Sequence, residues 1–199
     1  MSEIAWFRQR CSTIFTFVKS PMPLLPEPTS RNDSDAPIAG VVPVELMTGD
    51  DDEDTSLLRG MLQDAEGYLR SFSWCKEVRG SFFGGGVGGI IAVFLFKIGP
   101  ARPDVGSWIW IIVGDIPSAY LPLEDAKSPA EVFQTYLRGM SKWVELAREG
   151  RNGTADDGVP PINVPATPEW AEKLDQRLNS LRLIVQPFFD DQGESSQVH

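Results

Sequence analysis

Histidine is almost absent from this 199-residue sequence, in which His199 is the single example. Without a second histidine the chain holds no Ser-His-Asp triad, no Cys-His pair and no metal site built on imidazoles. It also lacks the lysine motif of a phosphate-binding P-loop. The composition therefore predicts no metal ion and no cofactor, and it offers no catalytic residue.

Cysteine is scarce as well, and the two residues present, Cys11 and Cys75, form neither a CxxC motif nor a secreted-type pattern. Such usage is typical of free thiols in a reducing compartment, so we expect a cytoplasmic protein. Cys75 follows Trp74 at an expected helix-to-strand junction. Because no base is at hand to activate it, we interpret Cys75 as a buried structural thiol.

Positive charge is in short supply: 18 Lys and Arg stand against 28 Asp and Glu, a formal charge of −10. Nucleic acids are bound by clustered basic side chains, so this balance argues against a nucleic-acid partner. The acidity is concentrated in residues 21–54, where nine acidic residues accompany only Arg31. Charge therefore says little about what the rest of the chain binds.

Composition divides the chain into four parts. These are an amphipathic helix (1–19), a linker that is first proline-rich and then acidic (20–54), a single domain (55–188) and a disordered tail (189–199). Within the linker, residues 38–47 could form a short strand, which Pro43 would confine to the edge of a sheet. The acidic run 50–54 precedes an expected helix, where the helix dipole favours negative charge.

Inside the domain the periodicity changes from helix to strand and back to helix. Helical stripes are expected at 55–72, 129–150 and 168–185, and strands at 76–83, 90–98 and 107–114. Ser128-Pro129-Ala130-Glu131 has the pattern of a capping box. The last two strands are apolar on both faces, so we expect helices on one face and more helix or a second subunit on the other. The sequence thus predicts an α+β domain with an antiparallel meander.

The stretch FFGGGVGGIIAVFLF (82–96) contains the dinucleotide-loop spacing Gly84-x-Gly86-x-x-Gly89. Such a loop needs a helix after the last glycine, whereas the residues that follow are β-branched or aromatic. A membrane span is the second interpretation, but the uncharged run is short and nearly a third glycine. We therefore favour a turn in which glycine supplies positive φ angles or allows another backbone to approach closely.

Four residues are candidates for a partner surface or a pocket: Trp108, Trp110, Asp115 and Tyr120. Trp108 and Trp110 alternate onto one face of a strand, and Asp115 ends that strand. The simpler interpretations are a tryptophan core and a turn-forming aspartate. The alternative is a ligand pocket at the end of strand 107–114.

The chain also shows a resemblance. Ser71-Phe72-Ser73-Trp74-Cys75, the glycine run leading to Phe94-Leu95-Phe96, residues 108–117 and residues 163–182 resemble a group of small bacterial cytosolic proteins with no assigned activity. The similarity covers about residues 55–188. It implies a soluble bacterial protein with one domain, and it implies no reaction.

These observations favour a non-catalytic protein-binding module, comparable to secretion chaperones or immunity proteins by analogy of fold alone. Its partner would be another protein or a second copy of the chain. The alternative is a small-molecule-binding protein or an enzyme with a pocket near Asp115 and Tyr120. We expect the apolar face of residues 1–19 to contact protein, within the chain or in a dimer, rather than an anionic membrane surface.

Overall fold

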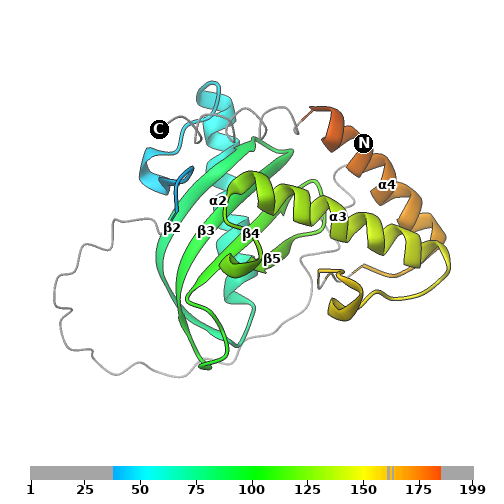
Figure 1. The fold of residues 1–199 in the computed structure, drawn as a ribbon. Coiled ribbons are helices and arrows are strands. Elements are labelled where there is room, and N and C mark those ends of the chain that lie inside the picture. The colour runs from blue at the N-terminus through cyan, green and yellow to red at the C-terminus, as the bar shows by residue number, and fades with distance from the viewer. Residues whose placement is uncertain (1–37, 161, 163, 185–199) are drawn as a thin grey trace, which may run out of the picture.

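The centre of the molecule is a five-stranded antiparallel sheet (Figure 1). The computed structural model describes residues 38–160, 162 and 164–184, so the expected helix 1–19 and tail 189–199 lie outside the described residues. Strands that follow one another in the chain are neighbours in the sheet. They are β1 (Val42–Pro43), β2 (Cys75–Val87), β3 (Ile91–Pro100), β4 (Trp108–Gly114) and β5 (Ala119–Pro122). The expected meander is confirmed.

Helices cover both faces of this sheet, as Figure 1 shows, with α2 on one side and α3 on the other. The α-helices are α2 (Asp52–Arg70), α3 (Pro129–Arg148) and α4 (Pro168–Ile184), and the short 3-10 helices are η1 (Val44–Leu46), η2 (Leu123–Asp125) and η3 (Ala155–Asp157). Helix α4 packs against α3 rather than directly on the sheet. The order of one helix, a meander and two further helices confirms the expected α+β fold.

Alternation along the strands produces two separate cores. On β3, Val93 and Leu95 face the α3 side, whereas Phe94 and Phe96 face the α2 side. All four side chains are fully buried. This arrangement explains why the strand is apolar at every position: each face has its own helix, supplied by the same chain.

Both long helices that touch the sheet begin at side-chain caps. At α2 the carboxylate of Asp51 accepts a hydrogen bond from the Asp54 amide at 2.8 Å, and acidic residues fill the first turn as expected. At α3 the hydroxyl of Ser128 accepts from the Glu131 amide at 3.2 Å. The Glu131 carboxylate accepts from the amide of Lys127 at 2.6 Å, one residue before the position that the capping box predicts.

The glycine run belongs to a strand and a tight turn. Strand β2 continues to Val87, and Ile91 begins the next strand, so no helix follows the glycine motif. Only residues 88–90 separate the two strands, and Gly89 supplies a positive φ of 74° in this turn. At Gly84 the absence of a side chain allows the start of α3 to approach the sheet, because a Cβ there would lie 3.1 Å from Pro129.

The folded region reaches further toward the N-terminus than residue 55. Thr55 lies inside α2, and Met47, which precedes that helix, is 2% exposed in the α2-side core. Pro43 lies in the edge strand β1, which pairs with β2 over two residues. In the part of the chain that the structure describes, no helix is both long enough and apolar enough to cross a membrane.

Candidate functional site

The three aromatic residues singled out from the sequence lie on opposite faces of the sheet. Trp110 faces α3, because it is paired with Leu95 in the α3-side core, and Trp108 lies two residues along the same strand. Tyr120 is paired with Ile111 and belongs to the α2 side. These aromatic residues therefore contribute to two separate surfaces.

The two tryptophans differ in what surrounds them. Trp110 is fully buried, and its indole N–H donates a hydrogen bond to the carbonyl oxygen of Ala126 at 3.0 Å. Trp108 is half-buried. Its ring lies 5.8 Å from that of Phe82, and the Lys97 ammonium lies 5.7 Å from its centroid, within cation–π range. Trp110 is a core residue, and Trp108 is accessible to a partner.

Asp115 connects three parts of the fold. Its carboxylate lies 2.9 Å from the Arg177 guanidinium on α4, and its amide donates to the carbonyl oxygen of Ile90 at 3.0 Å. The acid therefore links the end of β4 to α4 and to the β2–β3 turn. This environment suits an acid that fixes the position of α4.

Tyr120 belongs to a group of four rings that we call the aromatic cluster: Tyr68, Phe72, Trp74 and Tyr120. Phe72 stacks on Trp74 at 4.9 Å, and the Tyr120 ring meets Phe72 at 5.1 Å and Trp74 at 5.2 Å, edge to face. All four rings are half-buried, so the cluster lies at the surface of the α2-side core. Burial raises the pKa of Tyr68, and the neighbouring Tyr120 raises it further.

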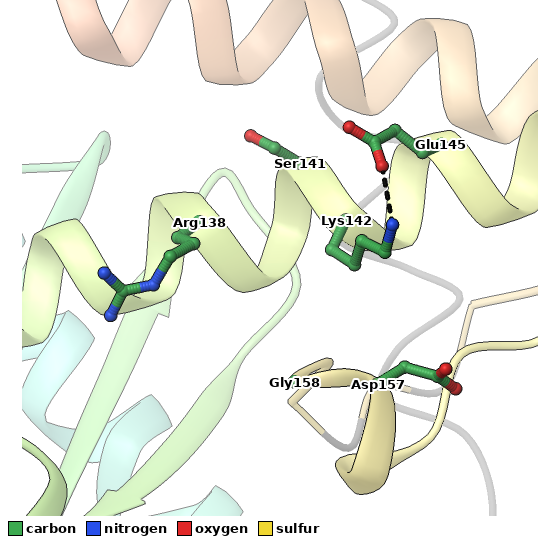
Figure 2. Close-up of a pocket in the computed structure, with 6 residues that line it drawn as sticks. All are labelled: Arg138, Ser141, Lys142, Glu145, Asp157 and Gly158. Carbon is green, nitrogen blue, oxygen red and sulfur yellow. Dashed lines mark hydrogen bonds and ion pairs between the residues drawn. The ribbon is translucent and has the colours of Figure 1, made fainter.

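A pocket of about 470 Å³ lies between α3 and η3 (Figure 2). Lys142 and Glu145, both on α3, form an ion pair at 2.9 Å along the wall of this pocket, and the hydrogen bond within the pair raises the Lys142 pKa. Figure 2 shows Arg138 and Ser141 pointing to different sides of α3. The two positive charges of the lining, on Arg138 and Lys142, are balanced by the two carboxylates of Glu145 and Asp157. The lining is Arg138, Ser141, Lys142, Glu145, Asp157 and Gly158, which includes none of the residues predicted from the sequence.

Neither a metal-ligand group nor a buried charged side chain occurs among the described residues. Across residues 38–160, 162 and 164–184, no three His, Cys, Asp or Glu side chains are grouped to hold a metal ion. In the same ranges every charged side chain is at least partly exposed. The aromatic cluster and the half-buried Trp108 with its neighbours Phe82 and Lys97 are thus the features best suited to binding a partner.

Three members of the aromatic cluster, Tyr68, Phe72 and Trp74, were not predicted from the sequence as site residues. Tyr68 and Phe72 are four residues apart on the apolar stripe of α2, and that spacing predicts packing against a core. Trp74 was noted only beside Cys75. The signal was the density of aromatic residues between 68 and 74, but their meeting with Tyr120 depends on where β5 lies.

Comparison with known proteins leaves the geometry as the only guide to function. No protein-family model, no curated protein and no solved structure matches the chain. The contacts, burial and charges of the described residues are therefore what indicates a function.

Proposed function

We propose that the chain is a non-catalytic protein-binding module and that its partner contacts the aromatic cluster. The observation that carries the proposal is the set of four half-buried rings, contributed by α2, the segment that follows it and β5. Aromatic side chains that are packed on one side and open on the other are the commonest anchors of protein interfaces. Their geometry is fixed by mutual contacts, so binding orders few additional side chains.

The surroundings of the cluster suit a protein partner better than a small ligand. Tyr120 lies on β5, the last strand of the sheet, and the rings therefore sit beside a sheet edge. Exposed Arg70 and Lys76 each lie two residues from a ring of the cluster in the sequence, Phe72 and Trp74, and could contribute the charged groups of a polar rim. A polar rim around aromatic anchors is the usual arrangement of a protein interface.

The cellular setting and the partner are part of the same proposal. Two cysteines with neither a CxxC motif nor a secreted-type pattern favour a reducing compartment, and the resemblance to bacterial cytosolic proteins makes the bacterial cytoplasm the proposed one. The partner is another protein or a second copy of this chain, in the manner of a chaperone-like or immunity-like module. A second copy would bring two clusters into a symmetric contact.

The test compares protein partners recovered with variants of the full chain. The chain would be tagged, expressed in its native cells and purified, with bound proteins quantified by mass spectrometry. We expect one protein to be recovered at least about tenfold less with Trp74→Ser or Tyr120→Ala, because truncating an anchor costs about 2 kcal/mol or more. Trp170→Ala is the matched control, since Trp170 is also half-buried but lies on α4.

Folding must be separated from binding in this comparison. A variant counts only if its melting temperature stays close to that of the parent chain. If no recovered protein, including a second copy of the chain, depends on the cluster more than on Trp170, the proposed function is wrong.

A further inference from the structure

The α3-side core stops before the end of the sheet. Its last buried cross-strand row consists of Phe82, Leu95 and Trp110. The next row, which we call the Trp108 row, consists of Gly80, Lys97 and Trp108, all half-buried. On the α2 side the core continues beyond this level to Ile98. One face of the sheet is therefore packed over a shorter length than the other.

The arrangement of the helices accounts for this difference. In Figure 1, α3 crosses the sheet near the β2–β3 turn, and no described α-helix lies over the opposite end, where β3 leads into β4. Helix α2 extends along the other face and contacts β2, β3 and β4. The Trp108 row is thus next to the edge of the α3 layer.

The Trp108 row has the chemistry of a shallow aromatic platform. The Trp108 ring packs beside Phe82, with the Lys97 ammonium close to its face. Gly80 carries no side chain and is half-buried, which leaves backbone accessible beside Lys97, whereas the ion pair of Glu77 and Arg79 covers the buried Gly99. Flat aromatic platforms with neighbouring polar groups bind proline-rich segments in polyproline II conformation.

We propose that residues 21–28 of this same chain, PMPLLPEP, dock on the Trp108 row. This inference concerns a different surface from the aromatic cluster and does not depend on the proposed function. The segment has four prolines, two leucines to contact the ring and one acid, Glu27, to meet Lys97. Because proline restricts the free chain, docking costs less conformational entropy than it would for an ordinary linker.

The chain enters the described structure on the correct side for this contact. Ile38 and Val41 pack against the α3-side core, and a Cβ on Gly40 would lie 3.5 Å from Pro129. Val42 is paired with Phe83, which is three residues from Gly80 along β2. The path from Ile38 back to Val42, across one strand spacing and along β2 to Gly80 is at most about 28 Å, and Gly80 is the member of the Trp108 row nearest to this entry point.

The intervening chain is long enough to span this distance. Residues 29–37, which separate the proline-rich segment from Ile38, can extend to about 30 Å. They also carry Asp33 and Asp35, which are complementary to the positive charge of Lys97. Length and charge both favour docking within one molecule.

A photo-crosslinker at position 108 tests the contact in the full chain. Trp108 would be replaced by p-benzoyl-phenylalanine, and the irradiated monomer band digested with trypsin. Cleavage after Lys19 and Arg31 places the proline-rich segment in one peptide, residues 20–31, apart from the peptides of 1–19. We expect an intrachain adduct with this peptide and no such adduct from the same crosslinker at Trp170.

The other outcomes would overturn the inference. Adducts with peptides of residues 1–19 would identify the expected helix as the occupant, and adducts only in a band of twice the mass would identify a second copy. Absence of adducts at position 108 would mean that nothing of this chain docks there.

A second measurement avoids any change in the sheet. Hydrogen exchange in the full chain should become about tenfold faster for amides in residues 97–108 when Leu24→Ser and Leu25→Ser are combined, because a docked segment protects the backbone beneath it. Amides of α2 serve as the internal control. Unchanged exchange in 97–108 would overturn the inference.

Discussion

Adding a methyl group at Gly86 would place a Cβ atom 2.6 Å from the carbonyl oxygen of Ile91 and 2.8 Å from the Cα of Ala92. Both neighbours are backbone atoms of the paired strand, which cannot move aside easily. We therefore expect Gly86→Ala to lower the free energy of unfolding by about 1–3 kcal/mol. Denaturation in urea measures this change in the free energy of unfolding. The expected loss comes from the clash with β3 and does not involve a bound nucleotide.

Gly67 is the matched control for Gly86. It is exposed inside α2, and a Cβ there would meet no heavy atom within 4 Å. Gly67→Ala should raise the free energy of unfolding by roughly 0.5–1 kcal/mol, because alanine favours the helix and has fewer unfolded conformations. A loss of stability at Gly67, or none at Gly86, would contradict this account of the glycines.

Two tyrosines make stability sensitive to alkaline pH. Burial raises the pKa of Tyr136, whose hydroxyl donates to the Pro117 carbonyl oxygen at 2.9 Å, and that of Tyr68. Below pH 10, the ordinary tyrosine value, both states keep the proton and stability is complete. Above pH 10 the unfolded chain loses protons that the folded chain retains, so the free energy of unfolding falls.

A conservative variant checks this pH dependence. Each fully shifted tyrosine contributes a slope of at most about 1.4 kcal/mol per pH unit above pH 10. Urea unfolding between pH 8 and 11 should show a shallower decline for Tyr68→Phe than for the parent chain. Parallel curves would mean that Tyr68 ionises equally in both states.

At the scale of elements, the first turn of α3 connects the helix to the glycine-rich end of β2. The Ser128 hydroxyl caps the helix, and Pro129 packs on Gly84. Ser128→Ala should cost about 1 kcal/mol of unfolding free energy in a urea titration, since one amide loses its acceptor. Ser128→Asp retains an acceptor and adds favourable charge, so it should stay near the parent value. Equal losses in both variants would rule out the cap as the cause.

For the whole molecule, the structure predicts where the chain can be shortened. A chain that begins at residue 38 keeps β1, the buried Met47 and the Asp51 cap, whereas one that begins at residue 55 loses all three. Loss of Met47 burial alone corresponds to about 2–5 kcal/mol. We expect the shorter chain to melt roughly 5–15 °C lower in a calorimetric scan. Equal melting temperatures would place the start of the folded unit at residue 55.

Local sequence determined the types of most elements in this protein. The stripe of α2, the Ser-Pro start of α3 and the both-sided apolar strands each depend on residues a few positions apart, and periodicity or capping reports on that range directly. The turn interpretation of Gly84–Gly89 was reached in the same way, from the β-branched residues that follow. The residues that fix these features are neighbours in the chain.

Tertiary structure decided the extent of β2 and the composition of the surfaces. The sequence ended this strand at residue 83 because glycine disfavours strands, but pairing with β3 keeps the backbone extended to Val87. The Gly88 amide donates to the carboxylate of Asp54, 34 residues away, at 2.6 Å. Tyr120 similarly meets Trp74 only because the intervening strands place β5 beside the end of α2. Contacts between such distant residues leave no periodic signal, because packing alone brings them together.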